Sequence, residues 1–233
     1  MSLRNVRLIS FDCYGTLIDW ESGIITALQN VLRAHALHIR DDEILAAYSR
    51  FEPRLQTGPW RPYREILRGI IQQFGQLFGF QPTEPEQDAL SESLPGWGPF
   101  PDTNAALHAL ERRYRLAVLS NIDNDLFAAT ARRLDARFDL VVTAEDVRSY
   151  KPGLTHFRTL LTRTGLPPEQ HVHVAESLYH DIAPATRLGI PNVWVQRRHG
   201  QRAAMASPAA DCEPDHKVRD LAELVALLDA ENA

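Results

Sequence analysis

Short apolar runs alternate with amphipathic stretches through the second half of the chain. Four of these runs are rich in Val and Leu and have the length of buried strands: 116–120, 140–143, 172–175 and 192–195. The segments between them carry apolar residues at helical spacing. Strands that alternate with helices in this way pack as a parallel sheet with helices on both faces. The sequence therefore predicts an α/β fold with a doubly wound parallel sheet.

An earlier strand is predicted at residues 6–11, and the residues after it contain helical patterns and no convincing strand. This helical stretch ends in the loop 94–102, where three prolines and two glycines fall within nine residues. The stretch is therefore interpreted as an insertion after the first strand, with a small-molecule cleft beside it. We expect a core domain of residues 1–14 and 98–233 and a helical cap domain of residues 15–97.

The charge and composition of the chain exclude several classes of function. The net charge of −5 and the absence of a basic stripe argue against nucleic-acid binding. No apolar run approaches the roughly 20 residues that a membrane span needs, and residues 1–7 lack the apolar core of a signal peptide. Cys13 and Cys212 are too far apart for a metal or redox motif. We expect a cytoplasmic protein that acts on a small molecule.

Asp12 directly follows the first predicted strand, and Gly15 then allows a tight turn. Ligands of open α/β sheets bind beyond the carboxyl ends of the strands, so Asp12 is placed to face a ligand. A carboxylate in such a place can act as a nucleophile and form a covalent ester. The commoner role of an Asp after a strand is to cap a turn, and the motif alone does not decide between the two.

Polar residues also follow the later strands. They are Ser120 and Asn121, then Lys151, and then the pair Glu176 and Asp181. Ser and Asn can bind an anionic group, a lysine would keep a nearby carboxylate ionised, and two carboxylates could hold a metal or activate water. Taken singly, each has an ordinary structural explanation: a turn, a solvated lysine, a helix cap. Together they lie at successive strand ends, which is where an α/β sheet collects one site.

The order of these motifs resembles that of the haloacid dehalogenase (HAD) superfamily of hydrolases, and the resemblance covers nearly the whole chain. It implies a Rossmann-like core with an inserted helical cap. By this resemblance Asp12 is the nucleophile, Ser120 the hydroxyl of the second motif, Lys151 the lysine of the third and Asp181 the carboxylate of the fourth.

Tyr14 distinguishes the branches of this superfamily. Phosphatases carry a second Asp at this position to protonate the leaving oxygen, and a phenol with a pKa near 10 cannot readily replace it. The run from Asp12 to Thr16 resembles the L-2-haloacid dehalogenase branch, whose halide leaving group needs no proton. The resemblance implies halide displacement from the α-carbon of a short 2-substituted carboxylic acid. Water then opens the aspartyl ester, with Asp181 or Glu176 as base, and no cofactor or metal is implied.

The fourth motif departs from this branch. Dehalogenases usually have Ser and Asn where this chain has Glu176 and Leu178, and an acidic residue at the first position resembles the Mg²⁺-dependent phosphatases. The runs 12–20, 120–123 and 175–181 also resemble the azetidine-2-carboxylate hydrolases, relatives of the dehalogenases that open a strained C–N ring. Two alternatives therefore remain open: a ring-opening C–N hydrolase and a Mg²⁺-dependent phosphatase.

The substrate-binding residues are expected on both domains. Ser120 and Asn121 would bind the substrate carboxylate, and the cap would add an arginine. Arg50 is the first choice and Arg54 the second, with a solvated helix residue as the equal alternative for Arg50. The aromatic side chains that could form an apolar wall around the leaving group are Tyr14, Trp20 and Phe51, although aromatic residues more often pack in a core. A homodimer is left open.

Overall fold

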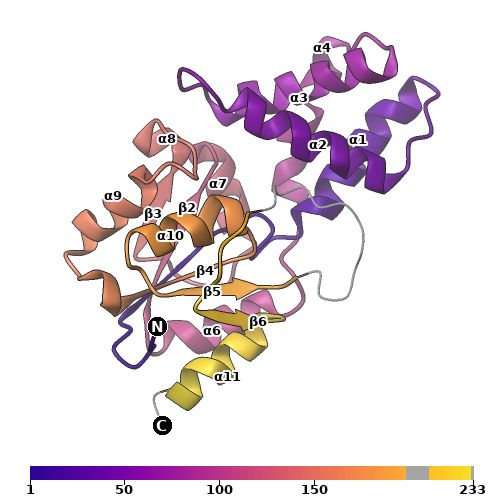
Figure 1. Cartoon of the computed structure of the whole chain (residues 1–233). Helices are drawn as coiled ribbons and strands as arrows, with labels where there is room; N and C mark the ends of the chain where they lie inside the picture. The colour runs from indigo at the N-terminus through magenta and orange to yellow at the C-terminus, as the bar shows by residue number, and fades with distance from the viewer. Residues whose placement is uncertain (198–209, 232–233) are drawn as a thin grey trace.

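The computed structural model describes residues 1–197 and 210–231, and its centre is a six-stranded sheet in the order β3-β2-β1-β4-β5-β6 (Figure 1). All neighbouring strands are parallel. The predicted doubly wound α/β sheet is therefore confirmed. The strands are β1 (Leu8–Phe11), β2 (Arg115–Ser120), β3 (Leu140–Thr143), β4 (His171–Ala175), β5 (Asn192–Val195) and β6 (His216–Val218).

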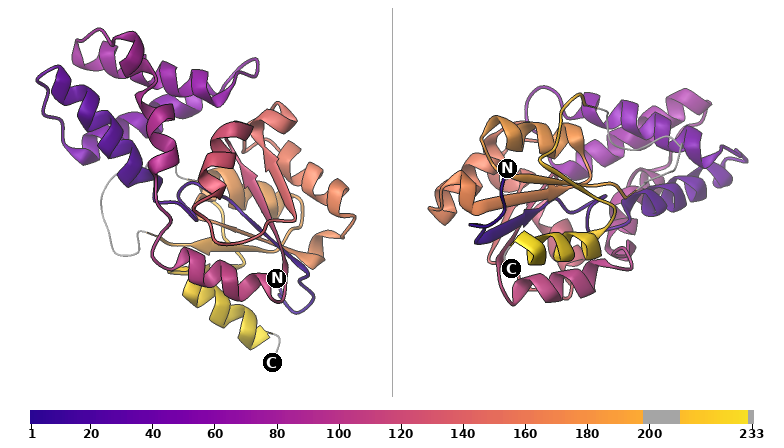
Figure 2. Two further views of the ribbon diagram at one scale, coloured as in Figure 1. Left: turned by 180° about the vertical axis from the view of Figure 1, so that it is seen from behind. Right: turned by 60° about the horizontal axis from the view of Figure 1, so that its bottom comes forward.

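Helices cover both faces of the sheet because successive side chains of each strand point to opposite sides. On β1, Leu8 belongs to the apolar cluster of one face and Ile9 to that of the other. The face of Leu8 is packed by α9 (Thr155–Thr164) and α10 (Ala183–Arg187). The face of Ile9 is packed by α6 (Thr103–Glu111), α7 (Asn124–Ala131) and α11 (Leu221–Glu231) (Figure 2). A short helix, α8 (Ala144–Val147), follows β3.

The first five helices after β1 gather in a bundle beside the sheet, drawn at the upper right of Figure 1. They are α1 (Trp20–Ala34), α2 (Asp41–Leu55), α3 (Tyr63–Phe78), α4 (Glu84–Gln87) and α5 (Ala89–Ser93). The amphipathic α3 supplies a buried face that includes Ile66, Ile70 and Phe74. This bundle supports the proposal that residues 15–97 are the cap.

The chain passes between sheet and bundle twice, and the two connections contact each other. Ile18 on the outgoing connection forms an antiparallel bridge with Pro99 on the returning one. Arg197, which follows β5, donates to the carbonyl of Thr16 over 3.0 and 2.7 Å and to both carboxylate oxygens of Asp102 over 2.7 and 2.8 Å. One guanidinium group thus ties both connections to the sheet.

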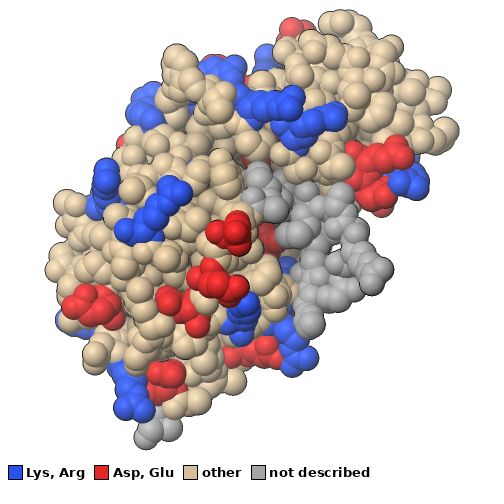
Figure 3. All heavy atoms as spheres, in the orientation of Figure 1, with Lys and Arg blue, Asp and Glu red and all other residues tan. Residues whose placement is uncertain are grey.

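The surface carries charges of both signs. On the face shown in Figure 3, Lys and Arg side chains are interspersed with Asp and Glu side chains over the core. Within residues 1–197 and 210–231, no helix has the length and apolar character that crossing a membrane requires.

Candidate active site

Lys151 lies between two carboxylates at the carboxyl edge of the sheet. Its Nζ is 2.8 Å from Asp12 Oδ1 and 2.7 Å from Asp181 Oδ1, and it donates to the carbonyl of Leu119 over 2.8 Å. Asp12 follows β1, Lys151 lies in the loop after α8, and Asp181 lies in a π-helical turn (Leu178–Ile182) after β4. The parallel sheet thus brings three distant segments to one ammonium group.

The two carboxylates differ in their pKa. Burial raises the pKa of Asp12, and the charges of Lys151 and Asp181 act on it in opposite directions. Burial would also raise the pKa of Asp181, but the Lys151 charge and the hydrogen bond with His173 bring it down to about 2. Asp181 therefore stays ionised at neutral pH, and Asp12 is the more readily protonated partner.

Side chains behind the carboxylates fix their positions. Thr16 Oγ1 donates to Asp12 Oδ2 over 2.8 Å. The ring of His173 bridges the other carboxylate to the sheet, with Nε2 3.0 Å from Asp181 Oδ1 and Nδ1 2.9 Å from Ser10 Oγ. A carboxylate held in this way would lose little rotational freedom in a reaction.

Ser120 and Asn121 have different roles in the structure. The Asn121 side chain bonds the backbone of Lys151 twice, accepting from its N–H over 2.7 Å and donating to its carbonyl over 3.1 Å. It thereby positions the lysine loop. Ser120 Oγ is buried and has no hydrogen-bond partner among the described residues. The Ser120 hydroxyl is therefore the group that remains to bind a substrate oxygen.

A small cavity of about 40 Å³ opens beside Asp12. Seven of the side chains proposed from the sequence line it: Asp12, Tyr14, Trp20, Ser120, Asn121, Lys151 and Asp181. Four further residues that the sequence analysis did not select also line it: Glu52, Tyr63, Ser177 and His180. The cavity thus lies between the sheet edge and the helices α2 and α3 of the bundle.

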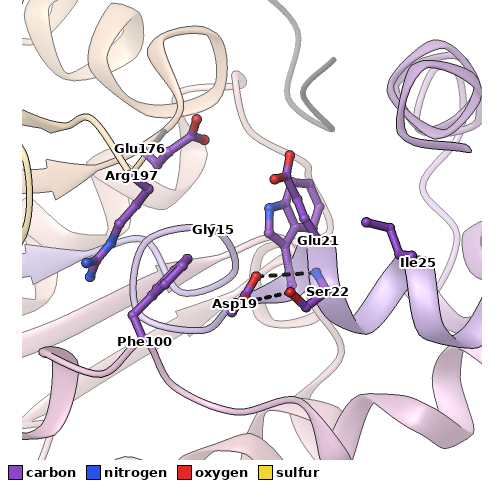
Figure 4. A pocket seen from close by; sticks show the side chains of 9 residues that line it. Gly15, Asp19, Glu21, Ser22, Ile25, Phe100, Glu176 and Arg197 are labelled. Atoms are coloured by element: carbon purple, nitrogen blue, oxygen red, sulfur yellow. Dashed lines mark hydrogen bonds between the residues drawn. The ribbon is translucent and has the colours of Figure 1, made fainter. Parts of the chain in front are cut away.

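Glu176 lines a neighbouring cavity of about 220 Å³ together with Trp20, Phe100 and Arg197 (Figure 4). Its backbone N–H donates to Thr16 Oγ1 over 3.0 Å. The structure therefore does not bring the Glu176 carboxylate into the cavity of Asp12 and Asp181. Among the described residues, no group of three or more His, Cys, Asp and Glu side chains is arranged to hold a metal ion.

The structure does not bring the expected cap arginine to the cavity. Arg50 is exposed, and its guanidinium lies 4.9 Å from the centre of the Phe51 ring. Phe51 packs edge-on against Phe74 inside the cap, and Arg54 is exposed. Because α2 turns by about 100° per residue, Glu52 faces the cavity instead.

Glu52 is buried and bonded to two tyrosines. Tyr63 donates to its Oε1 over 2.6 Å and Tyr48 over 3.4 Å, and the two hydroxyls are 3.0 Å apart. Burial raises the pKa of Glu52 to about 7, against the effect of both hydrogen bonds. Ile44, Tyr48 and Glu52 are spaced by four, which is the signal that could have placed Glu52 on the buried face of α2.

Comparison with known proteins identifies relatives over almost the full length. A family model described as haloacid dehalogenase-like hydrolase matches residues 6–189. The chain is 24% identical to the (S)-2-haloacid dehalogenase of Pseudomonas putida over 229 residues, which are 95% of this chain and 96% of the relative. The crystal structure of an L-2-haloacid dehalogenase with 27% identity has a TM-score of 0.77 and covers 96% of this chain and 99% of that one.

The structure of the L-2-haloacid dehalogenase of Xanthobacter autotrophicus with chloropropionic acid covalently bound shares the fold. It has a TM-score of 0.77 at 21% identity, over 96% of this chain and 98% of that one.

Proposed function

Because the chain belongs to the haloacid dehalogenase-like hydrolases, we propose that it displaces a leaving group from the α-carbon of a short 2-substituted carboxylic acid. The observation that carries this proposal is the Asp12 carboxylate, which is paired with Lys151 at 2.8 Å and faces a small cavity. A carboxylate held there can attack carbon directly, and the attack needs no metal.

The proposed reaction has two steps. Asp12 attacks the α-carbon, the leaving group departs with its bonding pair, and an aspartyl ester forms. Water then attacks the carbonyl carbon of Asp12 and releases the hydroxy acid. Asp181 and His180 line the same cavity, and Asp181 Oδ2 and His180 Nε2 have no hydrogen-bond partner among the described residues, so these two side chains can orient this water.

The names of the relatives favour halide as the leaving group. The Pseudomonas putida relative is a 2-haloacid dehalogenase, and the Xanthobacter structure carries covalently bound chloropropionic acid. An amine leaving group, as in the ring opening of azetidine-2-carboxylate, is the second candidate. Its specific support is that no arginine lines the cavity within the described residues, whereas the buried carboxyl group of Glu52 does.

A phosphatase is the weaker alternative. Tyr14 stands where the phosphatase acid would be, and its hydroxyl is 2.7 Å from Thr130 Oγ1. Burial raises the pKa of Tyr14 well above its usual value, so it does not replace a carboxylic acid. We expect EDTA-treated enzyme to keep its turnover of 2-chloropropionate or azetidine-2-carboxylate. Hydrolysis of p-nitrophenyl phosphate that appears only with Mg²⁺ would favour the phosphatase instead.

A single turnover in ¹⁸O water, with enzyme in excess, tests the proposed mechanism. Because water opens the ester at the carbonyl carbon of Asp12, the first product should be unlabelled and the Asp12 peptide should carry the label. The Asp12→Asn variant should form no ester and keep the fold. Label in the first product with Asp12 unlabelled would show direct attack by water and would recast Asp12 as a base.

A further inference from the structure

Among the described residues, the helical bundle contributes one carboxyl group, that of Glu52, to the cavity in which Asp12 lies. Glu52 is 3% exposed, and both tyrosine hydroxyls bond the same oxygen, Oε1. Among the described residues, Oε2 is therefore the oxygen that remains for a ligand. In a displacement at carbon the leaving atom departs on the side opposite the nucleophile. With Asp12 on the sheet edge, that side is the cap, where Glu52 lies.

The charges around the cavity favour a cation at this place. Within the described residues that line it, Lys151 is the only Lys or Arg, and it already pairs with two carboxylates. Burial lowers the pKa of His180 to about 4, so its ring is neutral at pH 7. The titratable and charged groups facing Glu52 are Tyr48 on its own helix, Tyr63 on α3, Asp12 after β1, and Lys151, His180 and Asp181 across the cavity. Tyr150, whose ring is 6.3 Å from that of Tyr63, is a further neighbour.

We propose that Glu52 is the counter-ion of a cationic nitrogen on the α-carbon of the substrate, so that the group displaced by Asp12 leaves as an amine. This inference rests on the proposed displacement by Asp12 and specifies its leaving group. The substrate carboxylate is then left to the free hydroxyl of Ser120 and to Lys151 on the sheet side.

The step balances without any co-reactant other than water. The Asp12 oxygen forms a bond to the α-carbon, the bond from that carbon to the ammonium nitrogen breaks, and its electron pair stays on nitrogen as a neutral amine. Water later opens the ester. An unstrained amine is a poor leaving group, so the substrate class is a small cyclic amino acid whose nitrogen belongs to a strained ring.

The ionisation of Glu52 gives the two substrate classes opposite pH dependence. A zwitterionic cyclic amino acid needs the Glu52 carboxylate, so its kcat/KM should rise as the pH passes about 7. An anionic haloacid is repelled by that carboxylate, so its kcat/KM should fall over the same range. These profiles are measured on the unmodified enzyme with azetidine-2-carboxylate and 2-chloropropionate, and they do not depend on the folding of a variant.

Glu52→Gln keeps the size of the side chain and removes its charge. At pH 8 it should lower kcat/KM for azetidine-2-carboxylate about 100-fold, as expected for losing one partner of a buried charge pair. It should leave kcat/KM for 2-chloropropionate equal or higher, and both profiles should lose their inflection near pH 7. Glu43→Gln, an exposed position on the same helix, is the matched control and should change neither substrate.

Mass spectrometry of the Asp12 ester after one turnover separates the two proposals. An ester from azetidine-2-carboxylate that is lost in Glu52→Gln supports both. An ester from 2-chloropropionate alone, or ring opening that Glu52→Gln leaves unchanged, overturns the role of Glu52 while the displacement by Asp12 stands. An ester and product from neither substrate overturns the proposed function, and this inference with it.

Discussion

Lys151 is the residue on which the charge balance of the site depends. It is 1% exposed and is the shared ion-pair partner of Asp12 and Asp181. Although burial opposes it, the two carboxylates raise the pKa of Lys151, so the group stays cationic. Removal of one partner of a buried ion pair lowers stability far more than replacement of the whole pair by apolar residues, because the remaining charges stay buried without compensation.

The Lys151→Met variant should therefore lose about 3–5 kcal/mol in its free energy of unfolding at pH 7, together with turnover. The loss should be smaller at pH 5, because Asp12 without its cation is protonated more easily and the buried charge disappears. Denaturant unfolding at both pH values measures this. Lys217→Met, which removes an exposed lysine paired with Glu213, is the control and should lie close to the parent protein. Equal losses in the two variants would contradict a buried ion-pair role.

Tyr14 offers a separate test at the residue scale. Tyr14→Phe removes the hydrogen bond with Thr130 and should cost about 1 kcal/mol of stability. If the phenol is not an acid, kcat should change by much less than the about 10²- to 10⁴-fold that loss of a general acid produces. Thr130→Val breaks the same bond from the other side and should match it in both measurements. A large loss of kcat in Tyr14→Phe alone would make Tyr14 a proton donor.

The site residues at the edge of the sheet could be predicted from the sequence, and those on α2 and α3 could not. Ser120 ends a strand and Asp12, Lys151 and Asp181 lie beyond strands, and parallel strands bring their carboxyl ends to one edge whatever the details of packing. Glu52 and Arg50 differ by two positions on one helix, so their places depend on how α2 is rotated against the sheet. Arg50 was chosen by its position in the second predicted cap helix, and the four-residue spacing from Tyr48 that marks Glu52 was not used.

At the scale of elements, α3 is joined to the core through its first turn. Asp123, just before α7, accepts from the backbone N–H of Tyr63 over 2.7 Å and from that of Arg64 over 3.0 Å. The Asp123 carboxylate thus satisfies two of the free N–H groups at the start of α3. The same contact places Tyr63, and through it Glu52, at the cavity.

Asp123→Ala should cost about 1–2 kcal/mol of stability and speed hydrogen exchange at the amides of Tyr63 and Arg64. Because those amides position Tyr63 against Glu52, KM should rise more than kcat falls. Hydrogen exchange read by mass spectrometry or NMR, with steady-state kinetics, tests both points. Asp125→Asn removes the neighbouring exposed ion pair with Arg64 and should leave the exchange rates unchanged. Unchanged exchange in Asp123→Ala would show that α3 does not depend on this cap.

The elements themselves were predictable where their patterns are long or fully apolar. The strand 140–143 has the bounds expected from sequence. The edge strand β6 (His216–Val218) was not predicted, because its three residues include His and Lys and carry no apolar run. Pro53 lies inside α2, which ends two residues later at Leu55.

For the whole molecule, the buried carboxyl group of Glu52 links stability to pH. Its pKa is about 7 in the fold and near 4.5 in an unfolded chain, so between these values the folded state holds a proton that the unfolded state has lost. The contribution of Glu52 to the free energy of unfolding is therefore fully present below about pH 4.5 and is lost as the pH rises to about 7. His156 and His180 contribute in the opposite sense, since burial lowers the pKa of His156 to about 3 and that of His180 to about 4.

The comparison of Glu52→Gln with the parent protein isolates this contribution. The free energy of unfolding of the variant, relative to the parent, should increase by about 3 kcal/mol between pH 4.5 and 7. Urea titrations at several pH values measure it, and Glu43→Gln should show no such change. A relative stability that does not vary with pH would place the pKa of Glu52 at its ordinary value.

The bridge between Ile18 and Pro99 makes the segment between these two residues exchangeable. The segment between these residues leaves and rejoins the sheet domain at nearly one point, so a graft of different length or fold meets the same two neighbouring ends. Arg197 would still donate hydrogen bonds to Thr16 and Asp102, which lie outside the segment. Asp12 and Lys151 can therefore stay unchanged while the helical segment opposite them is exchanged. We expect chimeras in which the segment between Ile18 and Pro99 is replaced by that of a relative to differ in their leaving-group preference.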